Sequence, residues 1–183
     1  VRVMTSSSSP GISLKSEGLS YMAGCDLPAL IVNVQRGGPG LGGIQPSQSD
    51  YLQATRGGGH GDYHMLVLAP NSVQEMAQLT IQGFALAEKY RMPCMLLADG
   101  TMGQMMEPVE LPDTAPEMVE KPWALTGTGL SRKHNIINSL SLTPDELERW
   151  NIDRYARYAK VEADEVMYEE YLTEDADVCV VGY

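Results

Sequence analysis

The sequence predicts an α/β fold in which flanking helices cover a parallel β-sheet. Short apolar runs alternate with segments of helical period through residues 1–100, which is the pattern of a parallel sheet with helical connections. The apolar runs are continuous rather than alternating, as expected of strands that are buried on both faces. Loops rich in glycine and other small residues follow the runs.

The first unit of this pattern is a strand, a loop and a helix. Residues 1–4 are apolar enough for a strand, and residues 5–11 form a loop of small residues. Residues 12–23 are expected to form a helix that places Ile12 and Leu19 on one face.

A stronger strand follows at residues 29–34, where only Asn33 interrupts the apolar run. Glycine dominates the next loop, at residues 37–43, which precedes a short helix over residues 47–55. A second glycine loop covers residues 57–61.

The clearest helix of the sequence comes next. Residues 65–69 form the third predicted strand, after which Ser72 and Glu75 have the spacing of a capping box and helical periodicity continues to Tyr90. Residues 95–98 then supply a fourth strand. This order of elements predicts one α/β domain over residues 1–110.

Two further regions follow that domain. Residues 111–174 are expected to be a proline-rich linker and helical arm, and residues 175–183 the first strand of a second α/β domain. Within the arm, Thr143 and Glu146 suit the start of a helix that extends through Leu172, either continuously or with a break near Asn151. From Thr101 onward the sustained periodicity is lost, and Pro108, Pro112, Pro116 and Pro122 punctuate the chain. Both ends of the chain lie in apolar segments, so we expect a piece of a longer polypeptide.

Composition excludes several classes of function. The 24 acidic and 13 basic residues give a net charge of −11, which repels a phosphate backbone and argues against nucleic-acid binding. No apolar run is long enough to span a membrane, and the cytoplasm is the expected compartment. Cys25, Cys94 and Cys179 are too far apart to ligate zinc or an iron–sulfur cluster by themselves.

Two loops at the carboxyl edge of the sheet are candidate binding elements, because open α/β sheets bind ligands there. The hydroxyl-rich loop that contains Ser8, Ser9 and Gly11 suits a polar ligand, but a plain turn with a helix cap is an equal alternative. Arg36 opens the first glycine loop and suits a carboxylate, although an isolated arginine is more often a structural ion-pair partner. His60 and His64 could form an acid–base pair or ligate a metal ion, but a structural role is the favoured interpretation.

Four ordered segments carry a family resemblance. TSSSSPGISL, VNVQRGGPGLGGIQPSQSDYLQATRGGGHGDY, VLAPNSVQEM and LLADGTMGQMMEPVELP resemble the alpha-type subunit of 2-oxoacid:ferredoxin oxidoreductases. The RGGPG and IQPSQSD forms, with the tail from KPWALTGTG to YEEYLTEDADV, are most similar to the branched-chain enzymes that act on 2-oxoisovalerate (3-methyl-2-oxobutanoate).

The resemblance implies a role for each region of the chain. Residues 1–110 would be an incomplete pyrimidine-type domain for thiamine diphosphate, and residues 175–183 the start of a transketolase C-terminal-like domain. Arg36 matches the family arginine that faces the substrate carboxylate. Ser8, Ser9 and Gly11 match the loop near the cofactor's pyrimidine ring. No catalytic residue and no metal ligand is expected within this chain.

The implied enzyme is a hetero-oligomer. Thiamine diphosphate would be shared with a beta-type subunit, while the divalent metal and the [4Fe-4S] clusters would belong to beta-type and ferredoxin-like partner subunits. The implied reaction decarboxylates a branched-chain 2-oxoacid oxidatively, forms acyl-coenzyme A and carbon dioxide, and passes electrons to ferredoxin. The chain alone would be inactive.

Other functions stay open at this point. The family includes enzymes specific for 2-oxoglutarate or pyruvate. The chain could also be a non-catalytic subunit for assembly and docking, or part of a transketolase-like thiamine enzyme.

Overall fold

The computed structural model describes residues 1–113 and 118–183. The chain forms two compact units, Val1–Leu140 and Ser141–Tyr183. Pro116, one of the prolines expected to punctuate the linker, lies outside the described residues. The first unit contains β1 (Met4–Ser7), α1 (Pro10–Ser13), α2 (Ser16–Gly24), β2 (Ala29–Gln35), α3 (Tyr51–Thr55), β3 (Leu66–Leu68), α4 (Val73–Tyr90), β4 (Pro93–Asp99) and the 3₁₀ turn η1 (Met102–Gln104).

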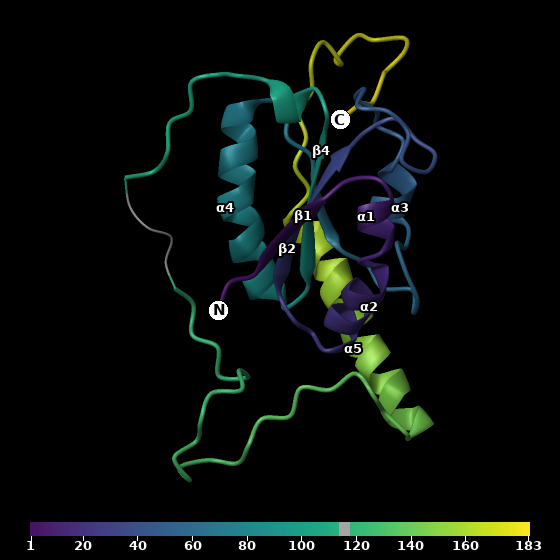
Figure 1. The fold of residues 1–183 in the computed structure, drawn as a ribbon. Helices are drawn as coiled ribbons and strands as arrows, with labels where there is room; N and C mark the ends of the chain where they lie inside the picture. The colour runs from purple at the N-terminus through teal and green to yellow at the C-terminus, as the bar shows by residue number, and fades with distance from the viewer. Residues whose placement is uncertain (114–117) are drawn as a thin grey trace. The chain divides into compact units, whose positions relative to one another are not determined.

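The four strands form one parallel sheet in the order β1-β2-β4-β3, which confirms the predicted fold class. Central strands β2 and β4 pair over seven residues, from Ala29 opposite Pro93 to Gln35 opposite Asp99. Helices cover both faces, with α4 on one side of the sheet and α1, α2 and α3 on the other (Figure 1). The carboxyl ends of β1 and β2 therefore lie side by side, with Ser7 opposite Asn33.

One core fills the space between the sheet and the helices α1 to α3. Residues with odd numbers on β2 point to this side, because side chains alternate along a strand. The buried members of this core are Ile12, Leu19, Ala23, Ala29, Ile31, Ala54, Tyr63, Met95 and Leu97.

The opposite face packs against α4, where close contact depends on a glycine. A Cβ atom added to Gly83 would lie 2.9 Å from Leu30 Cδ1 and 3.3 Å from Cys94 Sγ. Both neighbours are fully buried. Burial raises the pKa of the Cys94 thiol to about 12, so this cysteine is an unreactive core residue.

The helix α4 begins as the sequence predicts. Ser72 Oγ accepts a hydrogen bond from the Glu75 backbone N–H at 3.1 Å, and the Glu75 carboxylate accepts one from Asn71 N at 2.6 Å. These contacts satisfy backbone donors that a helix start otherwise leaves unpaired.

The first strand lies three residues later than predicted. Backbone pairing of Ser6 with Val32 and of Ser7 with Asn33 extends β1 into the serine run, so pairing with β2 overrides the weak strand preference of serine. The helix expected over residues 12–23 is also interrupted, and it forms α1 and α2 with a turn at Leu14 and Lys15.

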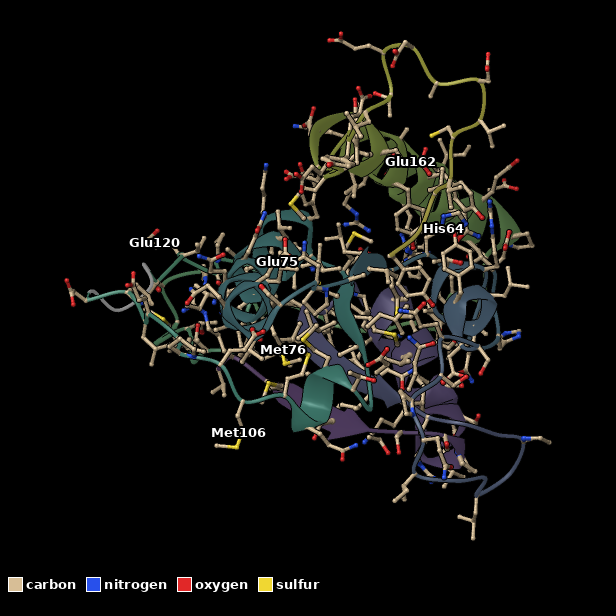
Figure 2. The ribbon with its side chains drawn as sticks, turned by 90° about the horizontal axis from the view of Figure 1, so that it is seen from above. His64, Glu75, Met76, Met106, Glu120 and Glu162 are labelled. Atoms are coloured by element: carbon tan, nitrogen blue, oxygen red, sulfur yellow. The ribbon has the colours of Figure 1, made fainter. Side chains whose placement is uncertain are left out.

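After η1 the chain runs along α4 without regular structure, and we call residues 105–113 and 118–124 the strap. Near the start of α4, Gln74 exchanges two hydrogen bonds with the backbone of Glu110, at 3.1 and 2.7 Å. The Glu107 carboxylate accepts a hydrogen bond from Val73 N at 3.1 Å. Met106 points away from these contacts and is 97% exposed (Figure 2).

Near the end of α4, the strap meets a buried carboxylate. Lys121 Nζ lies 2.5 Å from Glu88 Oε1. Arg2, which precedes β1, reaches the same carboxylate with Nε at 3.0 Å and Nη2 at 3.1 Å. Burial raises the pKa of Glu88, but the hydrogen bonds and charges of Arg2 and Lys121 outweigh that effect and hold the pKa below its ordinary value.

The second unit is built on one helix, α5 (Pro144–Asp164). Thr143 is its N-cap by position, but its side chain makes no capping hydrogen bond, and Glu146 instead accepts one from Ser141 Oγ at 3.0 Å. The helix continues through Asn151 without a break and ends at Asp164, not at Leu172. Glu165 and Glu169 would repel each other one turn apart, and carboxylates oppose the negative end of the helix dipole.

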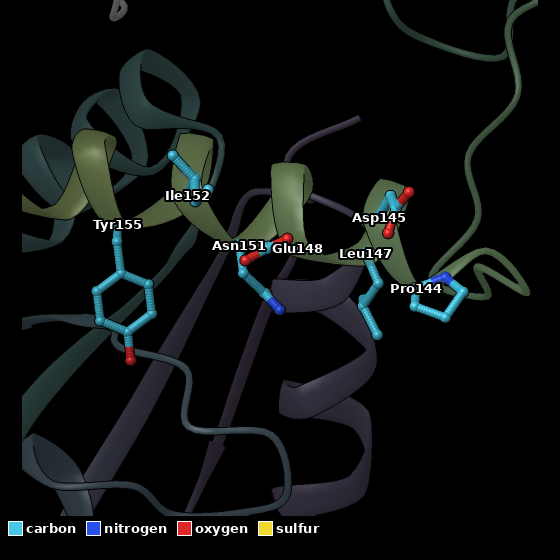
Figure 3. A pocket seen from close by; sticks show the side chains of 7 residues that line it. All are labelled: Pro144, Asp145, Leu147, Glu148, Asn151, Ile152 and Tyr155. Carbon is cyan, nitrogen blue, oxygen red and sulfur yellow. The ribbon is translucent and has the colours of Figure 1, made fainter.

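One face of α5 carries a shallow hollow of about 600 Å³, whose lining residues Pro144, Asp145, Leu147, Glu148, Asn151, Ile152 and Tyr155 all come from this helix (Figure 3). Residues 175–183, expected to begin a further domain, form no strand in the structure. A strand requires a neighbour for its backbone groups, and no described strand pairs with this segment. Their assignment to a following domain stays a prediction. None of the described helices is both long and apolar enough to cross a membrane.

Candidate functional site

The two loops singled out from the sequence meet at the carboxyl edge of the sheet. The serine loop follows β1, and the glycine loop opened by Arg36 follows β2, the strand next to β1. A direct hydrogen bond joins them, from Arg36 Nε to Ser8 Oγ at 3.0 Å. Residues 28 positions apart in the sequence thus form one polar cluster.

The guanidinium of Arg36 is held in place by its own loop. Its Nη1 donates to the backbone oxygen of Gly43 at 2.9 Å and also to that of Leu41. With Ser8 on Nε, three of the five donors of the group have partners, while Nη2 makes no hydrogen bond to any described residue. The charged group is therefore oriented, and one of its nitrogens remains available for a ligand.

The glycine loop closes tightly beneath this arginine. Gly37 N donates to Gln45 O at 2.9 Å, and Gly43 N donates to Gly37 O at 2.9 Å. Gly42 has a φ of +55°, and a Cβ atom there would lie 1.7 Å from Gly37 O. Only glycine fits this position, since a side chain would push apart the turn that brings the Gly43 carbonyl to Arg36.

The serine loop has a compact turn of its own. Ser9 has a φ of 51°, a left-handed conformation that is uncommon outside glycine. The backbone N–H of Gly11 is engaged by Ser8 O at 3.1 Å, and a Cβ atom on Gly11 would lie 2.0 Å from Ser7 Oγ. Gly11 thus allows a close approach of backbone to side chain, and its amide is occupied within the turn.

An open hollow of about 660 Å³ lies beside the arginine. Its lining residues are Ser9, Pro10, Ser13, Arg36, Gly37, Gly38, Pro39, Gly40, Ser47, Ser49, Asp50 and Gln53. Hydroxyls and amides dominate the wall, with Gln53 Nε2 donating to Ser13 Oγ at 3.2 Å and Ser47 Oγ to Ser49 Oγ at 3.1 Å. Of the sequence-predicted residues, Arg36 and Ser9 line the hollow, Ser8 holds the arginine, and Gly11 supports the turn.

Sequence reasoning missed a buried polar group directly below this hollow. Asn33 Nδ2 donates to Asp50 Oδ2 at 3.2 Å, and Gln35 Oε1 accepts from Asp50 N at 2.9 Å. Asn33 is fully buried and Gln35 is 1% exposed. The sequence does contain a signal for them. Asn33 and Gln35 are two residues apart, so they share one face of a strand that is otherwise apolar and that ends immediately before Arg36.

The second glycine loop has structural contacts. Ser20 Oγ donates to the backbone oxygen of His60 at 2.5 Å. A Cβ atom on Gly59 would lie 2.9 Å from Ser16 O, so the loop packs closely on α2. His64 lies on the same segment (Figure 2). No group of three or more His, Cys, Asp or Glu among the described residues is arranged to hold a metal ion.

Known proteins match this chain over most of its length. Residues 1–170 match the family described as pyruvate flavodoxin/ferredoxin oxidoreductase, thiamine diphosphate-binding. The ketoisovalerate oxidoreductase subunit VorB of Methanothermobacter marburgensis is 53% identical over 183 residues, which are 100% of this chain and 52% of the relative. The 2-oxoglutarate synthase subunit KorA of Methanothermobacter thermautotrophicus is 49% identical over 116 residues, 62% of this chain and 30% of the relative.

A solved structure has the same fold. It is 2-oxoglutarate:ferredoxin oxidoreductase from Magnetococcus marinus with 2-oxoglutarate, coenzyme A and succinyl-CoA bound, with a TM-score of 0.70 and 27% identity. The match covers 91% of this chain and 33% of that chain. The chain spans about half the length of the VorB relatives that it matches. It belongs to the thiamine diphosphate-binding family of pyruvate flavodoxin/ferredoxin oxidoreductases.

Proposed function

We propose that this chain is the substrate-facing part of an alpha-type subunit of a 2-oxoacid:ferredoxin oxidoreductase. The enzyme would decarboxylate a branched-chain 2-oxoacid oxidatively to acyl-coenzyme A and carbon dioxide, and pass the electrons to ferredoxin. One observation carries the proposal: the Arg36 guanidinium is fixed at the carboxyl edge of the sheet, beside an open hollow, with Nη2 unbonded to any described residue.

Arg36 is proposed to bind the carboxylate of the 2-oxoacid. A charge-assisted hydrogen bond from Nη2 would orient the substrate, and Ser8 and Gly43 would keep the guanidinium from turning with it. Decarboxylation removes the negative charge that the arginine recognises. The interaction would therefore hold the substrate and release the product.

The cofactor of the family is thiamine diphosphate, and the serine loop is chemically suited to its pyrimidine ring. When bound, the cofactor stabilises the negative charge that develops on the substrate carbon as carbon dioxide leaves. Ser8 and Ser9 provide hydroxyls at the edge of the sheet, and Ser9 faces the hollow. Gly11 would contribute only by keeping the turn compact, because its N–H is already bonded to Ser8 O.

Partner subunits are part of the proposal. The described residues hold no cluster suited to a metal ion, so we assign the diphosphate, its divalent ion and a [4Fe-4S] cluster to a beta-type subunit. Ferredoxin-like subunits would hold the further clusters. The functional enzyme would then be a hetero-oligomer, and this chain alone would be inactive.

A branched-chain substrate is favoured over 2-oxoglutarate by the extent of similarity. The VorB relatives match all of this chain at 53% and 52% identity, whereas the KorA relative from Methanothermobacter thermautotrophicus matches 62% of it at 49%. Values of kcat/KM for 2-oxoisovalerate, 2-oxoglutarate and pyruvate, measured side by side on the complete enzyme, would decide the substrate class. A higher value for 2-oxoglutarate or pyruvate would overturn this assignment.

The role of Arg36 is tested by Arg36→Lys in the complete enzyme. Lysine keeps the charge but loses the planar fork that Ser8 and the loop carbonyls hold, so kcat/KM for 2-oxoisovalerate should fall about 10- to 100-fold, the equivalent of about 1.5–3 kcal/mol for a hydrogen bond to a charged group. Arg56→Lys, at the exposed C-cap of α3, is the matched control. An unchanged kcat/KM in Arg36→Lys would refute the role.

A further inference from the structure

Two buried amides on β2 connect to the arginine site through a single aspartate. Asn33 and Gln35 lie on the same face of the strand and both bond to Asp50, the first to its carboxylate and the second to its backbone N–H. Gln35 immediately precedes Arg36 in the chain. Asp50 lies at the end of residues 44–50, which lead from the glycine loop to the start of α3.

The loop of residues 37–50, between Arg36 and Asp50, is fixed to β2 at both of its ends. At its start, Arg36 forms an isolated antiparallel bridge with Pro46, and Gly37 N bonds to Gln45 O. At its end, Asp50 is fastened to the strand by both amides. The position of residues 37–50 relative to β2 thus depends on two sets of contacts. One is the pair of hydrogen bonds that join Asn33 and Gln35 to Asp50, and the other is the backbone bridge between Arg36 and Pro46. The carbonyls that orient the guanidinium belong to this loop.

Two buried amide side chains at this place in the core are not what stability alone would favour. Asn33 Oδ1 and Gln35 Nε2 are buried and have no hydrogen-bond partner in the described chain. Their surroundings are apolar, since Ile31 precedes them on the same face and Leu97 lies opposite Asn33 in the register. A buried polar atom without a partner is destabilising, and an apolar side chain of similar size would avoid that cost. Sites that break this rule are expected where function requires them.

We propose that Asn33 and Gln35 are positioning residues for substrate binding. They would fix Asp50, and through it the returning limb of the glycine loop, so that Arg36 is held at the distance and angle required for a 2-oxoacid carboxylate. This inference rests on the proposed role of Arg36. It adds two residues, Asn33 and Gln35, that do not line the hollow.

Two nearly isosteric substitutions test it in the complete enzyme, Asn33→Leu and Gln35→Met. Each removes a hydrogen bond to Asp50 and one buried atom that lacks a partner. We expect KM for 2-oxoisovalerate to rise about tenfold with kcat changed less than about twofold, because binding of the carboxylate is lost from ground state and transition state alike. The thermal midpoint of Asn33→Leu should equal or exceed that of the parent protein.

Gln74→Met is the matched control. It breaks two hydrogen bonds of a side-chain amide, as against one in each β2 variant, but these lie between α4 and the strap, so it should lower the thermal midpoint without changing KM. A rise of KM in Asn33→Leu at an unchanged midpoint supports positioning, since a purely structural residue would alter both together. If Arg36→Lys raises KM while both β2 variants leave it unchanged, the positioning role is refuted and the role of Arg36 stands. If Arg36→Lys has no effect, the proposed function fails first.

Discussion

Replacement of Glu88 by glutamine is the perturbation whose effect on stability the structure defines most fully. The Glu88 side chain is 3% exposed and carries a negative charge toward the end of α4. Its two partners come from distant parts of the first unit, Arg2 before β1 and Lys121 in the strap. The substitution keeps the size of the side chain and removes only the charge.

The expected loss is about 2 kcal/mol in the free energy of unfolding. Removal of one partner from a buried ion pair costs about 3–5 kcal/mol, because it leaves the other charge buried. Here the side chains of Arg2 and Lys121 are 19% and 14% exposed, so both cations can regain some hydration. The amide oxygen of glutamine also still accepts one hydrogen bond, which reduces the loss further. For 150–250 residues about 2 kcal/mol lowers the thermal midpoint by about 4–8 °C, and the shift is smaller in a longer chain.

The loss should depend on pH in a defined direction. The pKa of Glu88 is lowered in the folded protein, so the carboxylate stabilises the fold at pH values above the unfolded pKa of about 4.3. That contribution disappears as the pH falls through the lower, folded pKa and the carboxylate becomes protonated. The difference between parent and variant should be greatest near neutral pH and should shrink in acid.

Thermal unfolding of the full-length subunit, followed by circular dichroism from neutral pH down to pH 3, would measure both effects. Glu120→Gln, one residue before Lys121 on the exposed strap, is the control for a change of net charge. An equal midpoint of parent and Glu88→Gln at neutral pH would show that the cluster adds nothing to stability. A difference that grows as the pH falls would contradict the assigned sign of the pKa shift.

Three smaller effects are expected. Gly83→Ala should destabilise the fold by about 1 kcal/mol in thermal unfolding. Overpacking costs about 1–3 kcal/mol, which exceeds the gain of up to about 1 kcal/mol in helix propensity. A stabilised variant would contradict the close contact of α4 with the sheet. Ser8→Ala removes the acceptor from Arg36 Nε and should raise KM for the 2-oxoacid about fivefold in steady-state kinetics, the equivalent of about 1 kcal/mol; an unchanged KM would show that the loop carbonyls orient Arg36 without it. Glu107→Gln removes a negative charge at Val73 N, the start of α4, and should cost about 0.5 kcal/mol by urea denaturation at low salt, with no loss expected at high salt.

The strands and the position of Arg36 in the fold could be predicted because their signals are local. An apolar run such as residues 29–34 has few alternatives to a buried strand, and Ser72 with Glu75 specifies a helix start within four residues. Arg36 could be placed at the carboxyl edge of the sheet because it directly follows a buried strand, and its role in binding stays a proposal.

The remaining features depend on contacts between distant segments. β1 extends to Ser7 only because β2 supplies the pairing partner, and no local preference of serine indicates this. Asp50 lies 17 residues from Asn33, so their hydrogen bond could not be inferred without the path of the intervening loop. The same holds for the Arg2–Glu88 pair, whose members are 86 residues apart.

The prior engagement of the Arg36 guanidinium has a consequence for affinity. A ligand that approached a bare cation would gain a full new interaction, whereas here a bidentate ligand must displace Ser8 or a loop carbonyl from donors that are already satisfied. A carboxylate bound to Nη2 alone displaces nothing, and only the second contact of a bidentate ligand would be an exchange of partners with a small net gain. If Arg36 has its proposed role, such a site favours moderate affinity and rapid release of the product over tight retention, because the contact made through the carboxylate is lost with its charge.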